Sequence, residues 1–304
     1  MVMKASLRSG GEYMVAQLFA NGLAMGSLYA LSALGFGLIY NTTRVFHIAY
    51  GAVYTVSAYL LFALWTQYKI PLGIALIIAS ILTILLGILI DIHIYQPLLR
   101  QGSSFLIVMI SSLAVYIITV NIIALIFGNE IKVLRSGVAT TFSLGQVILN
   151  DIQILQIVAF AFVFFTLVLS LKWTNFGKII RAMRDNPDLL SLMGIDLQKV
   201  RWLIFGLGSL LAGLAAMLQA LDVGIDPNIR MSAVLIAAVA VIIGGVGILE
   251  APAFGGLLLG ILQSVVIWQA SGRWQEAVTF ALLILFLLFK PEGIFGQRRR
   301  LEEK

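Results

Sequence analysis

The chain has 304 residues, of which 61% are hydrophobic and 11% are charged. A soluble domain of this length cannot bury so much apolar surface, so the composition excludes a soluble globular protein. The chain contains no cysteine, which excludes disulfides, thiolate metal sites and thiol nucleophiles.

Apolar runs of membrane-spanning length recur along the whole chain and predict an all-α polytopic integral membrane protein with eight or nine transmembrane helices. The runs are uniformly apolar, whereas the strands of a β-barrel would alternate apolar and polar residues. Each candidate is long enough to cross, or nearly cross, about 30 Å of hydrocarbon at about 1.5 Å per residue. The nine candidates are 15–40, 48–67, 71–90, 104–127, 152–171, 202–221, 231–248, 253–270 and 274–289.

The first run, 15–40, is too long for the apolar core of a signal peptide and ends without a clear cleavage site, so it is expected to remain as a transmembrane helix. The weakest spans are 48–67, which opens with polar and glycine residues, and the closely spaced pair 231–248 and 253–270. Each is open to being broken or re-entrant inside the bundle. No linker interrupts the chain, so a single membrane domain is expected over residues 1–304.

Small residues recur at a spacing of four in two of these runs. Gly22 and Gly26 form one such pair, and Gly256 and Gly260 form another. This spacing lets helix backbones approach closely. Ordinary packing within the bundle is the favoured interpretation, and a loose internal repeat is the alternative.

Basic residues set the expected orientation. Six Lys and Arg residues lie in 172–201, and five lie from Lys290 onwards, including Arg298, Arg299 and Arg300. Four spans separate the two regions, so both can lie on one side, and the positive-inside bias makes that side cytoplasmic. Residues 128–151 are then external, and nine full spans would place the N-terminus outside. The same bias accounts for the net charge of +6, so no nucleic-acid partner is expected.

The segment 172–201 is unusually charged for this chain, and its first part predicts a short amphipathic helix. The apolar face would be made by Phe176, Ile179, Ile180 and Met183. The charged face would be made by Lys178, Arg181, Arg184 and Asp185.

A second short helix is predicted directly after the first. Asn186 is a favoured N-cap, Pro187 suits the first helical position and Asp188 complements the helix dipole, while Gly194 suits the C-terminal end. A loop that only sets topology needs neither caps nor an apolar face. The pair of helices therefore predicts a docking element for a cytoplasmic partner, and a plain solvated loop is the alternative.

The chain lacks the residue patterns of an enzyme. No glycine-rich stretch has the context of a nucleotide site, and the two histidines, His47 and His93, lack metal-ligand spacing. Asp91 sits at the end of a span, where a solvated interfacial role is expected. Carboxylates within spans are scarce, whereas ion-coupled carriers usually contain them. The energy for any transport is therefore expected to come from another protein.

Four segments, in order, resemble the branched-chain amino acid permeases of ATP-binding-cassette importers, LivH type. They cover nearly the whole chain and include the charged segment with the helix that follows it. Their sequences are GLAMGSLYALSALGFGLIYN (22–41), RAMRDNPDLLSLMGIDLQKVR (181–201) running into FGLGSLLAGLAAML (205–218), AVIIGGVGILEAPAFGGLLLGILQSV (240–265) and FALLILFLLFKPEGIFG (280–296).

The resemblance implies a channel-forming subunit of the bacterial-type cytoplasmic membrane that works with several partners. These are a homologous second permease, two cytoplasmic ATPases and an external solute-binding protein. No cofactor is expected on this chain, because ATP and Mg²⁺ would bind to the partner ATPases. Residues 172–201 would be the coupling loop, with ATPase-coupling positions at Arg181, Arg184, Asp185, Asn186, Pro187, Asp188 and Gly194.

The chain departs from the family pattern in two motifs expected near the translocation path. The family usually has Asn-Phe-Ala-His-Gly where this chain has His47 to Gly51, and Gly-Gly-x-Gly-Ser-x-x-Gly-Ala where this chain has Gly244 to Pro252. The solute therefore stays open between branched-chain amino acids, other amino acids, urea and short amides. From these motifs the path candidates are His47, Tyr50, Gly51, Gly244, Gly245 and Gly247.

Further path candidates come from polar residues in or beside the spans. Irregular backbone at the start of 48–67 would line a cavity, and Arg44 lies close by, although snorkelling to the interface is its alternative role. The amides of Asn121, Gln219 and Gln263 suit a small neutral or zwitterionic solute, but each can equally form an interhelical hydrogen bond. A self-sufficient secondary carrier or channel is the competing function.

Overall fold

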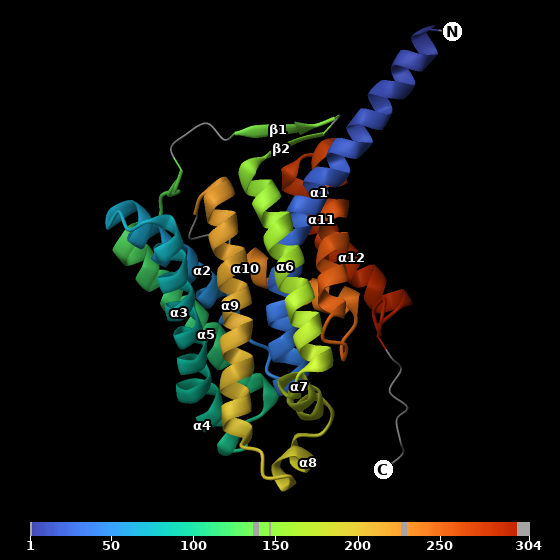
Figure 1. Cartoon of the computed structure of the whole chain (residues 1–304). Coiled ribbons are helices and arrows are strands. Elements are labelled where there is room, and N and C mark those ends of the chain that lie inside the picture. The colour runs from blue at the N-terminus through green and yellow to red at the C-terminus, as the bar shows by residue number, and fades with distance from the viewer. Residues whose placement is uncertain (1, 136–139, 146, 226–229, 297–304) are drawn as a thin grey trace.

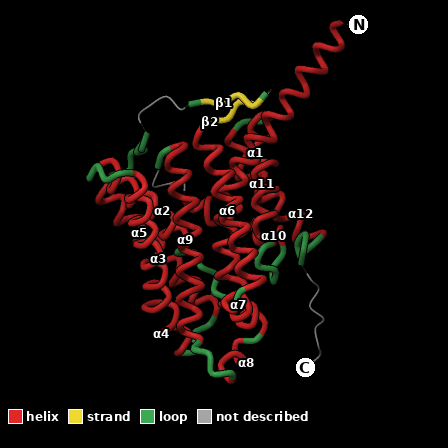
Figure 2. The backbone as a smooth tube through the Cα atoms, viewed as in Figure 1, coloured by secondary structure: helices red, strands yellow, loops and turns green. Residues whose placement is uncertain are grey.

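The computed structural model describes residues 2–135, 140–145, 147–225 and 230–296 (Figure 1). Arg298, Arg299 and Arg300 lie outside the described residues. The described chain is a helical bundle with one short β-hairpin (Figure 2). Its main elements are α1 (Val2–Thr43), α2 (Tyr50–Phe62), α3 (Leu72–Ile90), α4 (Gln96–Arg100), α5 (Phe105–Phe127), β1 (Thr141–Leu144), β2 (Val147–Asn150), α6 (Asp151–Trp173), α7 (Asn175–Asp185), α8 (Pro187–Leu192), α9 (Leu197–Val223), α10 (Arg230–Gly244), α11 (Ala251–Gln269) and α12 (Gln275–Phe289).

The bundle has two distinct ends. The β-hairpin lies at one of them, the hairpin end, and α7 and α8 lie at the other, the α7–α8 end (Figure 1). In the described chain, nine helices run alternately between the two ends and coincide with the nine predicted spans. They are α1, α2, α3, α5, α6, α9, α10, α11 and α12. The fold class predicted from the sequence is therefore confirmed, and the N-terminus lies at the hairpin end.

Two of the three spans that look weakest in the sequence, 48–67 and 231–248, form short helices. Seven helices in the described chain are long and apolar enough to cross a membrane. Helix α2 has 13 residues and continues into a π-helical segment, Ala63–Gln67, while α10 has 15 residues. Both adjoin irregular backbone at the α7–α8 end, over 44–49 before α2 and 245–250 after α10. Such backbone is tolerated in a membrane protein where protein covers it.

Helices α1 and α11 pack through the two small-residue motifs. A Cβ atom on Gly260 would lie 2.2 Å from the Cα atom of Gly26, and one on Gly22 would lie 2.7 Å from the Cα atom of Ile261. The two backbones are thus in direct contact, where only glycine fits. The favoured interpretation of these motifs, packing within the bundle, is confirmed.

Burial separates an inner group of helices from an outer group. Helices α1 and α9 are mostly buried, whereas few side chains of α3, α5, α6 and α12 are buried and many of their large apolar ones are exposed. Exposure of so many apolar side chains to water would be unfavourable. Exposure to the hydrocarbon of a bilayer is not, because lipid tails are as apolar as these side chains. The outer helices therefore form the surface that suits the bilayer.

The β-hairpin is an element that the sequence analysis did not predict. Its strands pair antiparallel, with Thr141 opposite Asn150 and Leu144 opposite Val147, and Gly145 has a φ of +63° at the turn. The side chain of Gln17 on α1 holds β2 through two hydrogen bonds of 2.8 Å with the backbone of Ile148. The hairpin is thereby fixed to the outer part of α1.

Candidate functional site

Helix α7 begins with a side-chain cap and buries one face. The hydroxyl of Thr174 accepts a hydrogen bond from the backbone N–H of Gly177 at 3.1 Å. Ile180 and Met183 are buried, while Phe176 and Ile179 are half-buried. The predicted apolar face of this helix is therefore present and packs against the bundle.

Helix α8 has the predicted caps at both ends. The side chain of Asn186 accepts hydrogen bonds from the next two free backbone N–H groups, both at 3.1 Å, and Pro187 opens the helix. Gly194 has a φ of +80°, and its N–H donates to the carbonyl of Ser191 at 3.0 Å. The N–H of Ile195 donates to the carbonyl of Leu190 at 3.4 Å, which completes the double closure typical of a glycine-terminated helix.

The surface of α8 is apolar as well as capped, which the sequence analysis missed. Leu189, Leu192 and Met193 expose 58%, 82% and 77% of their surface, although they lie beyond the end of the membrane-spanning helices. Leu190 alone turns inward and is buried. A rigid helix that presents large apolar side chains outside the bilayer region is typical of a protein-binding surface.

The charged residues predicted to couple α7 and α8 to an ATPase make different contacts. Arg181 donates to the carbonyl of Leu171 and so ties α7 to the last turn of α6. Arg184 forms an ion pair with Asp185 at 2.8 Å and also donates to the carbonyl of Gly247 at 2.8 Å. Asp188 is exposed in the first turn of α8.

The glycine candidates 244–247 form the sharp connection between α10 and α11. A Cβ atom on Gly244 would lie 2.2 Å from the carbonyl oxygen of Ala251, so the two helix ends nearly touch. Gly245 and Gly247 have φ values of +120° and +102°, which L residues rarely adopt. The N–H of Gly247 donates to the side chain of Asn41 on α1 at 2.9 Å.

The candidates near residue 47 lie at the break between α1 and α2. Arg44 is exposed, with a φ of +56°, and its N–H closes the end of α1. His47 is fully buried, and its Nδ1 atom is hydrogen-bonded to the hydroxyl of Tyr95 at 2.6 Å. Tyr50 is buried and donates to the carbonyl of Ser32 at 2.8 Å. Gly51 lets α2 approach Val234 of α10, since a Cβ atom there would lie 2.7 Å from its side chain.

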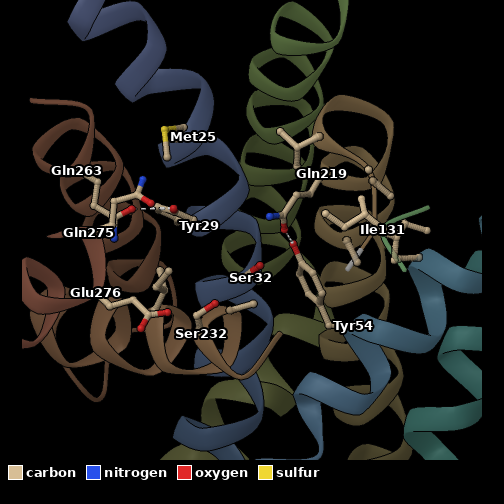
Figure 3. Close-up of a pocket in the computed structure, with 18 residues that line it drawn as sticks. Met25, Tyr29, Ser32, Tyr54, Ile131, Gln219, Ser232, Gln263, Gln275 and Glu276 are labelled. Carbon is tan, nitrogen blue, oxygen red and sulfur yellow. Dashed lines mark hydrogen bonds between the residues drawn. The ribbon is translucent and has the colours of Figure 1, made fainter. Parts of the chain in front are cut away.

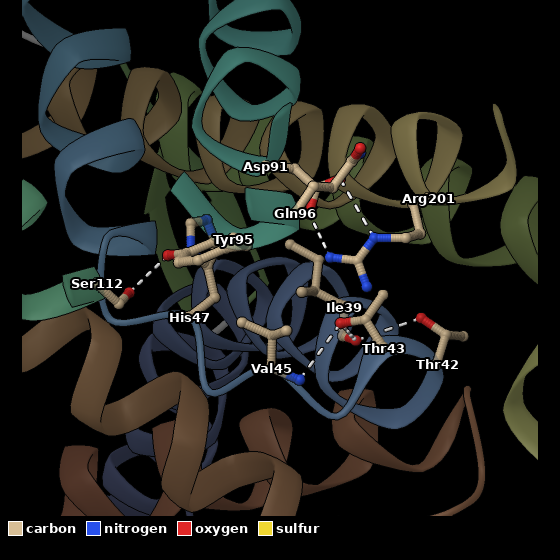
Figure 4. A network of polar contacts seen from close by, with 10 residues as sticks. All are labelled: Ile39, Thr42, Thr43, Val45, His47, Asp91, Tyr95, Gln96, Ser112 and Arg201. Atoms are coloured by element: carbon tan, nitrogen blue, oxygen red, sulfur yellow. Dashed lines mark hydrogen bonds and ion pairs between the residues drawn. The ribbon is translucent and has the colours of Figure 1, made fainter. Parts of the chain in front are cut away.

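Asp91 does not have the solvated role expected from the sequence. It is fully buried in a π-helical segment, Asp91–Tyr95, and forms an ion pair with Arg201 of α9 (Figure 4). The amide of Gln96 donates a second hydrogen bond to the same carboxylate at 2.8 Å. The expectation was wrong because the partner is 110 residues away in the sequence, so no local pattern shows that α9 closes over this carboxylate.

A cavity of about 330 Å³ (Figure 3) is lined in part by Val223, Gly224 and Ile225, at the end of α9 that lies nearer the hairpin end of the bundle. Two of the path candidates predicted from the sequence, Gln219 and Gln263, are among its lining residues. Asn121 does not line it; this side chain is exposed on α5 and bonds back to the carbonyl of Ile117 at 2.7 Å. The polar groups come from six helices: Tyr29, Ser32, Tyr54, Gln219, Ser232, Gln263, Gln275 and Glu276.

Two interhelical hydrogen bonds set the polar wall of the cavity. The hydroxyl of Tyr54 on α2 donates to the side-chain carbonyl of Gln219 on α9. The hydroxyl of Tyr29 on α1 donates to that of Gln263 on α11 at 2.7 Å, and Gln263 in turn donates to Thr279 at 2.6 Å. Each of these glutamines therefore forms an interhelical hydrogen bond and also lines the cavity. Their contact with a solute stays a prediction.

Comparison with known proteins identifies the family. The sequence matches, over residues 18–287, the family described as the permease component of the branched-chain amino acid transport system. This chain belongs to that permease family. The high-affinity branched-chain amino acid transport system permease protein BraD of Pseudomonas aeruginosa is 31% identical over 94% of this chain and 97% of its own length. The corresponding protein LivH of Escherichia coli K12 is 30% identical over 94% and 96%.

A solved structure shares the fold of this permease. It is titled PsaBC from Streptococcus pneumoniae in complex with Fab, and it aligns with a TM-score of 0.52 over 90% of this chain and 92% of that chain. The sequences are only 14% identical, so this comparison concerns the fold alone. The sequence-based recognition of the family is confirmed.

The two motifs in which this permease departs from the family pattern lie in its two irregular segments. His47 to Gly51 fills the break before α2, and Gly244 to Pro252 fills the turn between α10 and α11. Neither segment lines the cavity, but Tyr50 reaches Ser32, which does. The tyrosines of the cavity wall, Tyr29 and Tyr54, were missed from the sequence, where the only available signal was a hydroxyl in an otherwise apolar span.

Proposed function

We propose that this chain is the membrane-spanning permease subunit of an ATP-binding-cassette importer. It would form the translocation path for a small polar or zwitterionic solute, with a branched-chain amino acid as the first candidate. Family membership supports the transport role, and the relatives named above are branched-chain amino acid permease proteins. Other amino acids, urea and short amides are the remaining candidates.

The observation that carries this proposal is the pairing of a polar cavity with a docking surface at the opposite end. The cavity volume of about 330 Å³ is at the small end of the ~300–1,000 Å³ typical of small-molecule sites. Its lining combines apolar side chains with amides and hydroxyls, which suits a small solute with an apolar part. The capped helices α7 and α8 give a separate protein a firm surface on which to act.

The proposed assembly contains this chain, a homologous second permease, two ATPases that carry ATP and Mg²⁺, and an external solute-binding protein. The ATPases would dock on α7 and α8, which places the α7–α8 end in the cytoplasm of a bacterial-type cell. The segment from Lys290 to Gly296 lies at that same end, because the N–H of Ile294 donates to the carbonyl of Ile243 at 2.7 Å. The solute-binding protein would meet the hairpin end.

An ion-coupled carrier usually has an ionisable group in its spans that can bind and release an ion. The fully buried carboxylate of Asp91 already has Arg201 and Gln96 as partners. This arrangement favours a structural ion pair over an ion-binding site. The same group therefore gives the carrier hypothesis no support.

Reconstitution into liposomes tests the proposed function. The chain is purified with its sister permease and ATPases, and uptake of labelled leucine, alanine and urea is measured with the loaded binding protein outside and ATP inside. ATP-dependent uptake of one of these solutes is expected. Uptake by this chain alone, driven by a proton or sodium gradient, would instead establish the carrier.

The proposed orientation has its own test, because the chain has no native cysteine. Ser191 on α8 and Ser143 on β1 are both exposed and lie at opposite ends of the bundle. In intact cells, a membrane-impermeant thiol reagent should label Ser143→Cys and should leave Ser191→Cys unlabelled until the membrane is permeabilised. The reverse labelling pattern would invert the orientation.

A further inference from the structure

The backbone of Gly247 is hydrogen-bonded at both its N–H and its carbonyl by side chains of two distant helices. Its carbonyl accepts a hydrogen bond from Arg184 of α7 at 2.8 Å, and its N–H donates to the Oδ1 atom of Asn41 of α1 at 2.9 Å. Asn41 is fully buried, and the side chain of Arg184 is only 20% exposed. The contacts are thus sheltered from water, where a hydrogen bond to a charged group is strong.

The helices on both sides of Gly247 are in backbone contact. A Cβ atom on Gly255 of α11 would lie 2.0 Å from the carbonyl oxygen of Ala240 of α10. Gly245 also packs against Gly293, with 2.5 Å between a Cβ atom on Gly293 and the Cα atom of Gly245. Packed interiors pass on displacement rather than absorb it. We therefore expect a shift of the Gly247 backbone to move α10 and α11 together.

The far parts of these two helices carry cavity residues. Ser232 and Ile236 of α10 and Gln263 of α11 all line the cavity. At about 1.5 Å per residue, Gln263 lies roughly 18 Å along α11 from its start. Gln263 also anchors Tyr29 through its hydrogen bond of 2.7 Å.

We infer that Arg184 and Asn41 are positioning residues that connect α7 to the cavity through the backbone of Gly247. Arg184 transmits displacement of α7 to the turn between α10 and α11, and Asn41 holds that turn in register with α1. This inference rests on the proposed function, in which an ATPase moves α7. It assigns the transmission to the hydrogen-bonded backbone of one residue rather than to α7 and α8 as a whole.

The test measures the exposure of the cavity in the assembled transporter. Ser232→Cys serves as the probe, and its labelling rate by a small thiol reagent is compared in the nucleotide-free state and in the state trapped with ATP and vanadate. Without other changes, the rate should differ between the two states. Arg184→Ala should reduce that difference about tenfold, the change expected from the loss of one charge-assisted hydrogen bond.

Asn41→Ala should have the same effect, and the double variant should lose no more than either single one, because both residues act through the backbone of Gly247. Arg100→Ala is the matched control, since it removes an exposed basic residue at the same end of the bundle. Copurification of the ATPases with each variant shows that docking on α7 and α8 is intact.

Different results would contradict the proposed function and this inference. If the unmodified assembly shows no ATP-dependent uptake, the proposed function fails. If uptake is present and Arg184→Ala keeps the full nucleotide-dependent change at Ser232→Cys with the ATPases bound, the transmission runs elsewhere and only this inference is overturned. Loss of the change in the Arg100→Ala control would also overturn it, because a general charge effect would then suffice.

Discussion

Asp91 and Arg201 form an ion pair in which the carboxylate is fully buried and the guanidinium side chain is 13% exposed. The guanidinium also lies 5.6 Å from the ring centroid of Phe205. The pair joins the π-helical segment after α3 to the start of α9, two elements that are far apart in the chain. It therefore fixes the inner helix α9 against the outer helix α3 near the α7–α8 end.

Removal of the guanidinium tests the structural role of this pair. Arg201→Met leaves the buried carboxylate without its charge partner, which should lower the free energy of unfolding by about 3–5 kcal/mol. The midpoint of denaturation in detergent micelles measures the change. Arg100→Met, at an exposed position, should change the free energy of unfolding by less than about 0.5 kcal/mol. Equal midpoints for the two variants would show that the ion pair contributes nothing to stability.

Local features of this permease were predictable from the sequence. The caps at Asn186 and Gly194 depend only on residues a few positions away, so their chemistry is visible in the local sequence. The nine spans were predictable for the same reason, since apolar length alone defines them. The short helices α2 and α10 were predictable as weak spans because polar and glycine residues interrupt their apolar runs.

Long-range relationships could not be predicted. Gly247 meets residues 63 and 206 positions away, and nothing in its neighbourhood indicates which side chains they are. The same holds for the bonds of Tyr29 and Tyr54 that form the cavity wall. The β-hairpin had one local signal, the glycine at 145 between two β-prone stretches, but the short strands gave no periodic pattern long enough to oppose the interpretation as a loop.

The contact between α1 and α11 makes a second prediction about stability. Gly260→Ala places a methyl group against the backbone of α1, which cannot move aside, and overpacking of this kind costs about 1–3 kcal/mol. Gly73→Ala on α3 is the matched control, because no atom lies within 4 Å of the added Cβ. The midpoint of thermal denaturation in micelles should fall only for Gly260→Ala. Similar midpoints for the two variants would mean that α1 and α11 can move apart to accommodate the methyl group without a loss of stability.

The two caps of α8 make a prediction about coupling. Asn186→Ala removes the acceptor for two backbone N–H groups and should cost about 1 kcal/mol of local helix stability. Gly194→Val forces a β-branched residue to a φ of +80° and should cost as much or more. Both variants should assemble with the ATPases and accept the loaded binding protein, yet lose uptake and the stimulation of ATP hydrolysis.

Normal uptake by both cap variants, with the ATPases bound, would reduce the segment 172–201 to a topological spacer. Leu192→Ser provides an independent check, because Leu192 is 82% exposed and its replacement leaves both caps intact. It should weaken ATPase binding without changing the fold of α8. Circular dichroism of the purified assembly verifies that the helices are retained.

The cavity makes the last prediction, which concerns the solute. Gln219 accepts a hydrogen bond from Tyr54 and is held in one orientation by it, so its amide is preorganised for a polar group of the solute. Gln219→Leu removes the amide, and Tyr54→Phe removes only the hydroxyl that orients it. Loss of one buried hydrogen bond of about 1–1.5 kcal/mol should lower the uptake rate roughly tenfold with Gln219→Leu.

Tyr54→Phe should have a smaller effect in the same direction, and the double variant should match Gln219→Leu alone, because the hydroxyl acts through the amide. Asn121→Leu is the matched control, since it removes an exposed amide from the outer surface of α5. Uptake is measured in liposomes at saturating loaded binding protein, so that docking does not limit the rate. If Asn121→Leu impaired uptake and Gln219→Leu did not, the solute would pass along the outer surface of α5, where a second subunit would have to complete its path.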